Sequence, residues 1–569
     1  MIGERQGFRG CALPVLATVA MFAVTACGAE AQEQSTPSDL LAGRDWSHFA
    51  GARRESDGIH ISPLGRALVE QDGTGGSPNP PVNLRGPFLE VRGDFQVASG
   101  WRQVGDHSAY LYLYGEVPVV FDEWRQQRRA VRLGLDAGSL HVAVWDGMSA
   151  EPVTERTFEV AKFGPHSVAL EHRGGRLRIS ADGSELGELP DSGVFATGTV
   201  WFGADAAAGG PGWTLSALSA QGLDGGKVEV RDAPDLAQSP APRESLRTLA
   251  EAIPQRPPLR IGAAVSAGPL STDAAYRSIA AGEFSMLTTE NELKPQFVHP
   301  QPGVYDFTEA DTLVEFAERN GMSVHGHTLV FGEANPRWMT HTPAQDRRRV
   351  MEDHIATVAG HYRGRVAEWD VVNEPLSVED SDYADGKPGL RQHLWMQAMG
   401  ESYIGHAFRA ARAADPAAEL YLNEFGIEAD GRRWDALYAL VKRLVADNVP
   451  IDGVGFQNHI HESGDHLDQS ALRRHIQALQ ALGIASRISE TDIHGEDSAV
   501  QADQYAESLR ACRAEPSCTS FSTWGITDRY GSTADPGAYP PSPGDELLWT
   551  TDLQPKPAYA ALAQALSAE

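Results

Sequence analysis

Short apolar segments that alternate with helical patterns are the feature that most constrains how this chain folds. The alternation starts beyond Ser245, which is placed to cap a helix, and it continues to residue 567. Eight segments have the length and character of buried strands: residues 259–265, 284–288, 323–327, 367–372, 419–423, 453–457, 486–489 and 520–524. Eight strands, each followed by a helix, predict a (β/α)8 TIM barrel.

Polar and aromatic side chains stand at the C-terminal ends of these strands. Those ends share one face of such a barrel, so the side chains should converge on a common site. They are Glu290, Asn291, Lys294, His327, Asn373, Glu374, Asn423, Gln457, His459, Glu490 and Trp524. The set suits a polyol, and Glu374 with Glu490 would supply the paired carboxyl groups that cleave a glycosidic bond. Taken alone, each glutamate could equally be a solvated loop carboxylate.

Eight short motifs in this half of the chain occur in the order typical of one enzyme family. They are residues 289–294, 326–329, 369–375, 455–459, 488–493, 523–528 and 555–559, together with the loop from Cys512 to Cys518. On these motifs, residues 243–567 resemble glycoside hydrolase family 10, the retaining β-1,4-xylanases. The resemblance implies a TIM barrel that hydrolyses xylan by double displacement.

The resemblance also implies roles for the residues at the strand ends. Glu374 corresponds to the general acid/base and Glu490 to the nucleophile. The residues implied to assist them are Asn373 at the sugar 2-hydroxyl, Gln457 at the two carboxylates, and His459 with Asp492 behind Glu490. The pKa of Glu374 should be raised by burial and by the charge of Glu490, so that Glu374 starts the reaction protonated.

Substrate binding is implied for a second group of residues. Those expected to hold the sugars on the non-reducing side are Glu290, Asn291, Lys294 and His327, with Trp524 as a floor. No cofactor or metal is expected. A metal site built from His325, His327, His459 and His461 is the alternative, and it lacks a matching spacing of cysteines or carboxylates.

Four departures from the family pattern concern the sugar subsites. Phe331 and Gly332 stand where the family has Trp-His, and residues 423–426 read Asn-Glu-Phe-Gly in place of Asn-Asp-Tyr-Asn. Asn458 replaces a serine, and only Tyr530 stands near the place of a second tryptophan. Phe331 keeps a stacking face for substrate but lacks the N–H donor, and Gly332 removes a side chain. We therefore expect a pocket that is wider near the point of cleavage.

Three functions follow from these observations. The first is a retaining endo-β-1,4-xylanase. The second is a related retaining β-glycosidase that acts on a substituted xylan or another β-linked glycan. The third is a glycan-binding lipoprotein without activity, which the presence of both Glu374 and Glu490 disfavours because a binding protein does not need the pair.

Residues 44–224 show alternation at period two, with turn-forming pairs between short segments, and this predicts an all-β sandwich. Residues 166–189 and 198–215 resemble the hairpins of concanavalin-like jelly rolls. Such domains often bind polysaccharide through exposed aromatic rings, and the candidates are Trp101, Trp124, Trp145, Tyr112 and Trp213. The alternatives are that most of these rings pack in the core and that the domain is a spacer. Residues 225–242 are expected to be a linker, and residues 243–569 the catalytic domain.

The N-terminus is typical of an export signal. Positive charge at Arg5 and Arg9 precedes a short apolar run, and residues 24–28 resemble a bacterial lipobox with Cys27 as the lipidated residue. The alternative is an ordinary signal cleaved near Ala29 or Ala31. We expect a lipoprotein signal over residues 1–26, a tether over 27–43, and an extracellular or cell-surface location on a bacterium.

Cysteine usage and charge agree with that location. Cys512 and Cys518 close a short loop, and a disulfide between them is permitted outside the cytoplasm. The formal charge of −29 and the pI near 5.0 argue against nucleic acid and anionic lipid surfaces as partners. The expected partner is a polysaccharide, the membrane is contacted only through the lipid anchor, and the chain is expected to be a monomer.

Overall fold

The computed structural model describes residues 37–42, 52–62, 86–103, 108–115, 119–120, 126–127, 129–136, 138–147, 152–162, 164–206, 212–232, 235–238, 241–254, 258–377, 389–460, 467–495, 498–531 and 545–567. The expected signal over residues 1–26, the lipidation at Cys27, most of the tether, Trp124 and His461 lie outside these residues. None of the helices within the described part is long and apolar enough to cross a bilayer.

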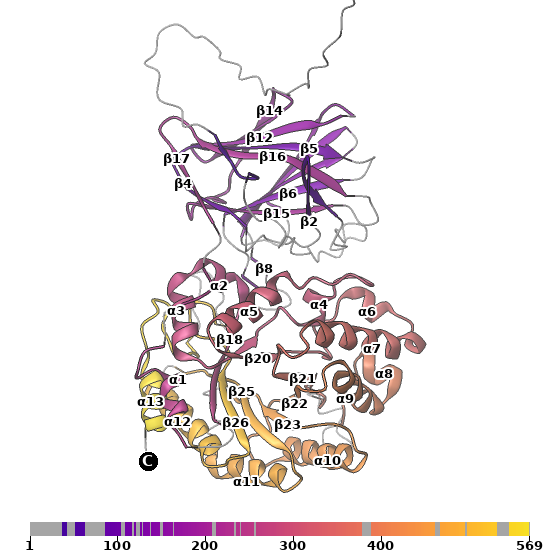
Figure 1. Ribbon diagram of the computed structural model, residues 1–569, viewed down its shortest axis with the longest axis vertical. Helices are drawn as coiled ribbons and strands as arrows, with labels where there is room; N and C mark the ends of the chain where they lie inside the picture. The colour runs from indigo at the N-terminus through magenta and orange to yellow at the C-terminus, as the bar shows by residue number, and fades with distance from the viewer. Residues whose placement is uncertain are drawn as a thin grey trace, which may run out of the picture.

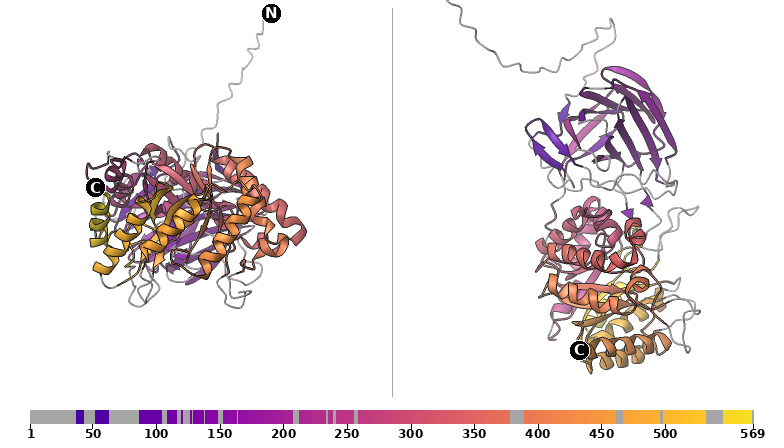
Figure 2. Two further views of the ribbon diagram at one scale, coloured as in Figure 1. Left: turned by 90° about the horizontal axis from the view of Figure 1, so that it is seen from below. Right: turned by 90° about the vertical axis from the view of Figure 1, so that its right-hand side faces the viewer.

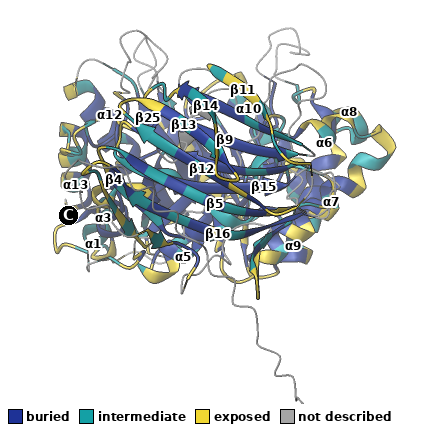
Figure 3. Cartoon of the chain, turned by 90° about the horizontal axis from the view of Figure 1, so that it is seen from above, coloured by how far each residue is buried: buried dark blue, intermediate teal, exposed yellow. Residues whose placement is uncertain are grey.

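Two antiparallel sheets that pack face to face form the N-terminal part (Figure 1). The first has the order β14-β13-β12-β5-β16-β3-β2, with β1 beside β16, and the second has the order β11-β10-β9-β6-β15-β4-β17. Their bounds are β1 (Ser38–Asp39), β2 (Ala52–Glu55), β3 (Gly58–Ile61), β4 (Phe88–Arg92), β5 (Phe95–Gln103), β6 (Ala109–Tyr114), β9 (Arg129–Asp136), β10 (Ser139–Asp146), β11 (Thr154–Glu159), β12 (His166–Arg173), β13 (Arg176–Ala181), β14 (Ser184–Pro190), β15 (Thr199–Ala206), β16 (Trp213–Gly222) and β17 (Lys227–Arg231). The expected β-sandwich is confirmed, but it extends beyond residues 44–224, since β1 lies in the expected tether and β17 in the expected linker. Figure 3 shows buried residues alternating with less buried ones along strands such as β5 and β12.

The aromatic residues proposed as sugar platforms are buried. Trp101 and Trp213 stack on each other between the sheets with ring centroids 4.5 Å apart. Tyr112 and Trp145 lie on the other face of the seven-stranded sheet, where they are 4% and 3% exposed. All four rings therefore follow the alternative of core packing, and the role of an exposed sugar platform is wrong for them.

The C-terminal part is a closed barrel of parallel strands surrounded by helices (Figures 1 and 2). The strand order is β23-β22-β21-β20-β19-β18-β26-β25, and β23 pairs with β25 to close the ring. The strands are β18 (Arg260–Val265), β19 (Met286–Thr289), β20 (Ser323–Gly326), β21 (Glu368–Asn373), β22 (Glu419–Glu424), β23 (Gly453–Phe456), β25 (Ala485–Ile493) and β26 (Cys518–Thr523), with the short β24 (His459–Ile460) beside β25. The predicted (β/α)8 barrel is confirmed.

Amphipathic helices cover the outside of the barrel. The longer ones are α3 (Ala274–Glu283), α5 (Thr308–Arg319), α7 (Ala344–His361), α9 (Ser402–Ala414), α10 (Arg432–Ala446), α11 (Gln469–Gln480), α12 (Ser498–Arg513) and α13 (Pro557–Ser567). The shorter ones are α1 (Leu246–Glu251), α2 (Ala267–Thr272), α4 (Pro295–Val298), α6 (Arg337–His341) and α8 (Leu394–Met399). Ser245 caps α1 by accepting a hydrogen bond from the backbone N–H of Thr248, as its position in the sequence indicates.

Two local features stabilise this frame. Gly326 lets the Trp369 ring of the neighbouring strand lie against the backbone, since a Cβ atom there would come within 2.3 Å of the ring. The expected disulfide between Cys512 and Cys518 is present, with Cα atoms 5.2 Å apart, and it joins the end of α12 to the start of β26.

A buried pair of histidines makes the barrel sensitive to acid. The Nδ1 atoms of His299 and His354 lie 3.1 Å apart. Burial lowers the pKa of His299 to about 4 and that of His354 to about 3, so both rings stay neutral in the folded chain at pH values where the unfolded chain takes up protons. Their contribution to stability is therefore complete above about pH 6.5 and is lost as the pH falls toward the folded-state values.

Replacing this pair with leucines is expected to flatten the acid limb of stability. In the native chain, the free energy of unfolding should fall between pH 7.5 and pH 4.5 by about 1 kcal/mol per pH unit for each histidine. In the double variant His299→Leu/His354→Leu much of that slope should disappear, as measured by urea unfolding across this range. The exposed His341→Gln should keep the native slope. An unchanged slope in the double variant would show that the acid sensitivity lies elsewhere.

Candidate active site

Side chains from five neighbouring strand ends meet at the C-terminal face of the barrel. Glu374 follows β21 directly, where Pro375 prevents further pairing, and Glu490 lies in β25. An amide network joins the two carboxyl groups. Its hydrogen bonds run from Gln457 Nε2 to Glu374 Oε1 (3.2 Å) and to Asn373 Oδ1 (3.3 Å), and from Asn423 Nδ2 to Asn373 Oδ1 (2.9 Å) and to Glu490 Oε1 (2.5 Å). The shared amides fix the two carboxyl groups relative to each other.

Glu490 is surrounded by hydrogen-bond donors and imidazoles. His459 Nε2 lies 3.3 Å from its Oε2 atom, and Asp492 holds the opposite ring nitrogen of His459 at 2.8 Å. Burial alone would raise the pKa of Glu490, but the hydrogen bond from His459 and the charges of His327 and His459 hold that pKa below its usual value. Glu490 is therefore ionised at neutral pH.

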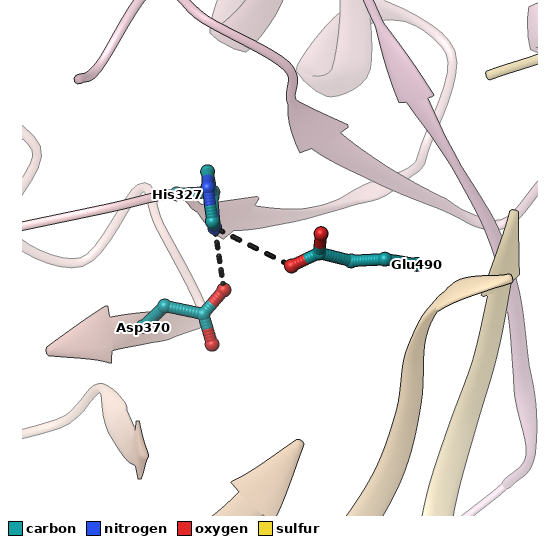
Figure 4. Close-up of side chains that lie close together, drawn as sticks. All are labelled: His327, Asp370 and Glu490. Carbon is teal, nitrogen blue, oxygen red and sulfur yellow. Dashed lines mark hydrogen bonds and ion pairs between the residues drawn. The ribbon is translucent and has the colours of Figure 1, made fainter. Parts of the chain in front are cut away.

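His327 links Glu490 to the interior of the barrel (Figure 4). Its Nδ1 atom lies 2.9 Å from Asp370 Oδ2 and 3.8 Å from Glu490 Oε1. Ligand atoms of these three residues lie within 4.8 Å of one another, so they could in principle hold a cation. Of the four histidines weighed as an alternative metal site, His461 lies outside the described residues, and His325 lies inside the barrel with Nδ1 3.1 Å from Glu368.

Glu374 has the opposite protonation preference. Burial is the main cause that raises its pKa, and the charges of Glu490 and Glu333 act in the same direction. The guanidinium of Arg391, whose Nη2 atom is 2.9 Å from Glu374 Oε2, lowers the pKa and limits the rise. The two glutamates are thus an acid that tends to keep its proton and a carboxylate that tends to lose it.

Sequence analysis did not identify Arg391 as a site residue. Leu376 and Leu390 form an antiparallel bridge, and the backbone N–H of Arg391 donates to the carbonyl of Pro375 at 2.8 Å. This small ribbon brings Arg391 back to the strand end that carries Glu374. The pairing joins segments on either side of residues 378–388, and no local motif indicates it.

The residues expected to hold sugar form one connected group beside Glu490. Ser266 donates to Glu290 (2.6 Å), Asn291 also donates to Glu290 (3.3 Å), and Lys294 donates to Asn291 (2.9 Å). Burial raises the pKa of Glu290 to about 7. The Trp524 ring lies 5.9 Å from Lys294 Nζ and in edge contact with His327, with ring centroids 5.2 Å apart. Trp524 therefore lies where the expected sugar-binding residues and the imidazoles around Glu490 meet.

The expectation of a wider pocket at Gly332 is wrong. A Cβ atom there would come within 2.8 Å of His393 and 3.2 Å of Arg391, so these two side chains fill the space. Phe331 is only 7% exposed, with the Arg391 guanidinium 6.0 Å from its ring centroid. The ring therefore packs against Arg391 and offers little free face to substrate.

Two other departures do not line the site as expected. Asn458 is fully buried and donates to Thr491 and Ser508, at 3.0 Å in each case. Tyr530 donates to Asp273 at 3.2 Å and packs edge-on against Tyr276. Asn458 thus connects β25 to α12, and Tyr530 packs the segment after β26 against the start of α3.

The fourth departure, residues 423–426, does reach the site. The changed residue Glu424 is buried beside Glu374, and the unchanged Asn423 belongs to the amide network. Arg433 forms an ion pair with Glu424 at 2.7 Å, and its guanidinium lies 4.2 Å from the ring centroid of Phe425. Arg433 also covers Gly426, where a Cβ atom would lie 3.3 Å from the arginine side chain. An arginine thus fills the space beside each of the two unexpected glycines.

Comparisons with known proteins agree with this geometry. The model of glycosyl hydrolase family 10 matches residues 248–565. Endo-1,4-beta-xylanase B of Thermotoga neapolitana is 34% identical over 298 residues, which are 51% of this chain and 82% of that protein. Endo-1,4-beta-xylanase A of Cellvibrio japonicus is 36% identical over 344 residues, which are 54% of this chain and 55% of that protein. The crystal structure of native xylanase 10B from Thermotoga maritima is similar with a TM-score of 0.51 and 36% identity, covering 57% of this chain and 98% of that one.

Proposed function

This chain belongs to glycosyl hydrolase family 10, and from that membership we propose that it hydrolyses β-1,4-xylosidic bonds in xylan by double displacement. The observation that carries the proposal is the pair of glutamates with opposite protonation preferences. Glu374 tends to keep its proton and Glu490 tends to lose it, while shared amides hold both at one face of the barrel. Such a pair supplies the acid and the nucleophile of a retaining glycosidase.

In the first step, the carboxylate of Glu490 attacks the anomeric carbon while Glu374 gives its proton to the leaving glycosidic oxygen. The bond between the anomeric carbon and that oxygen breaks, and a covalent glycosyl ester forms on Glu490. The negative charge of Glu490 disappears in this ester, so the pKa of Glu374 falls and Glu374 can take a proton from water. That water attacks the anomeric carbon and releases the sugar with its configuration retained.

The surrounding residues fit this sequence of steps. Asn373 stands between the two carboxyl groups, where it would accept or donate a hydrogen bond at the sugar 2-hydroxyl. His459, held by Asp492, would keep Glu490 ionised and correctly oriented. The connected group of Glu290, Asn291, Lys294, His327 and Trp524 would hold the sugars on the non-reducing side.

A related β-glycosidase with another substrate is the second candidate. The observation that favours it is the replacement of side chains beside the acid/base, where Arg391 and His393 occupy the space next to Gly332. These side chains change the surroundings of the leaving sugar and leave the catalytic pair unchanged. The reaction type therefore does not depend on which of the two candidates is right.

A substrate panel tests the proposal and separates the two candidates. The full chain is expected to release reducing ends from xylan and arabinoxylan at least about 10-fold faster than from mixed-linkage β-glucan, because glucose adds a hydroxymethyl group at each subsite. Proton NMR of the first product should show the β-anomer, as retention requires. Glu490→Ala serves as the enzyme blank. Activity on β-glucan with none on any xylan would exclude xylan as the substrate, and an α-anomeric first product would exclude double displacement.

A further inference from the structure

Arg391 makes a direct ion pair with the acid/base. Its Nη2 atom donates to Glu374 Oε2 at 2.9 Å, and its Nη1 atom donates to Glu333 Oε1 at 2.6 Å. The Glu333 side chain is 58% exposed, whereas that of Arg391 is 13% exposed. Since exposed carboxylates are well solvated, the stronger electrostatic effect of Arg391 falls on the more buried Glu374.

Several elements build the position of Arg391. The ribbon with Pro375 fixes its backbone, and the Phe331 ring lies beneath its guanidinium. Gly332 leaves the space that its aliphatic stem occupies, since a Cβ atom there would lie 3.2 Å from Arg391 Cδ. Any larger residue at position 332 would have to move Arg391 or His393.

The same segment is anchored to the barrel by α8. The backbone N–H of His393 donates to the carbonyl of Arg391 at 3.1 Å, and the His393 ring caps α8 by accepting from Trp395 N at 3.2 Å. Trp395 in turn donates from Nε1 to the carbonyl of Phe331 at 3.0 Å. Because backbone and side-chain contacts both hold the segment, the guanidinium has a fixed place beside Glu374.

The charges around Glu374 come from several elements. Glu490 on β25, Glu424 on β22 and Glu333 in the segment after β20 are acidic, and Arg433 on α10 already pairs with Glu424. His393 carries no charge near neutral pH, since burial and the charge of Arg391 lower its pKa to about 4. Within the described part of the chain, Arg391 is the cation that contacts the Glu374 carboxyl group.

We propose that Arg391 is a positioning residue that holds the Glu374 carboxyl group in place and weakens its hold on the proton. The inference rests on the proposed function, since it concerns the acid/base of that reaction. In the first step, the ion pair lowers the pH above which Glu374 is no longer available as an acid. In the second step, it favours the carboxylate that removes a proton from water.

The pH profile of kcat/KM tests this inference. In Arg391→Met, the alkaline limb of the kcat/KM profile for xylan should move to higher pH by about 1 unit or more, because an opposite charge at this distance lowers the pKa of a carboxyl group by that amount. Arg391→Lys should restore most of the native limb. The value of kcat/KM for 2,4-dinitrophenyl β-xylobioside should change little, because that leaving group departs without a proton. An exposed pair far from the site provides the control: Arg443→Met removes the partner of Glu401 and should leave both profiles unchanged.

A second variant keeps the inference falsifiable if Arg391→Met does not fold. Removing the charge of the exposed Glu333 in Glu333→Gln leaves Arg391 to act on Glu374 alone. The pKa of Glu374 should then fall, and the alkaline limb should move to lower pH. An unmoved limb in the folded Glu333→Gln, or in Arg391→Met where that variant folds, would overturn the inference.

A readout without activity separates this inference from the proposed function. The infrared carboxyl band that is lost in Glu374→Gln can be titrated in the native chain and in Arg391→Met. A higher midpoint in Arg391→Met supports the inference even if no xylan is cleaved, and equal midpoints contradict it even if xylan is cleaved. Failure on every xylan and aryl xyloside would overturn the proposed function alone.

Discussion

Replacing Glu490 with alanine is expected to lower kcat on xylan by on the order of 10⁵-fold, as for the loss of a covalent nucleophile in other enzymes. Glu490 is the buried carboxylate whose pKa the hydrogen bond and charge of His459 hold low. Without it, no group among the described strand-end residues is placed to form the glycosyl ester. Reducing-end release from xylan near neutral pH measures the loss.

The cause of that loss can be tested with two further variants. Glu490→Gln keeps the volume and the contact with Asn423 but cannot form the ester, so its activity should be as low as that of Glu490→Ala. Glu419→Gln changes a glutamate at the opposite, exposed end of β22 and should keep native activity and native thermal stability. Activity in Glu490→Ala within about 100-fold of the native value would mean that another residue is the nucleophile.

The barrel and its strand ends could be predicted because their signals are local. A buried strand needs only a short apolar run, and Pro375 marks where β21 must stop pairing. Once eight strands are aligned, Glu374 and Glu490 fall on the same face without any knowledge of side-chain packing. The sequence therefore predicts the strands and the strand-end positions of Glu374 and Glu490 from short segments alone.

Arg391 could not be predicted in this way because its position depends on pairing across a long connection. It stands 17 residues after Glu374, and the bridge between Leu376 and Leu390 brings it back. The surroundings of Gly332 differ from the prediction for a related reason. Protein interiors are close-packed, so a missing side chain is usually filled by a neighbour, and here the neighbours come from residues 391–393.

The sandwich shows the limit of alternation as a signal. A period of two places Trp145 and Val144 on opposite faces of one sheet, but it does not indicate which face is open. Both faces of the seven-stranded sheet are buried at these positions, with Val144 in the core between the sheets and Trp145 packed on the outer face. Aromatic residues in a sandwich sequence therefore identify a sugar platform only when their exposure in the structure is known.

Replacing Glu374 with alanine is expected to lower kcat/KM on xylan by about 10²–10⁴-fold, the usual contribution of a general acid. The loss should depend on the leaving group. A xylan chain leaves only as it is protonated, whereas 2,4-dinitrophenolate leaves unaided, so kcat/KM for the dinitrophenyl xylobioside should stay within about 10-fold of the native value. Steady-state rates on the two substrates measure the difference.

The surroundings of Glu374 add a second expected result to this variant. Truncation to alanine removes one carboxylate partner of Arg391 and leaves its guanidinium facing the space where Glu374 was. With the dinitrophenyl xylobioside, a small anion such as azide should enter that space, replace water in the second step and form β-xylobiosyl azide. Glu374→Gln also lacks the acidic proton of the native side chain, but its amide fills the space, so azide should rescue its activity poorly.

Two outcomes would contradict these expectations. Equal rescue of Glu374→Ala and Glu374→Gln by azide would show that the space beside Arg391 does not control anion entry. An equal loss of kcat/KM on xylan and on the dinitrophenyl xylobioside would exclude Glu374 as the acid.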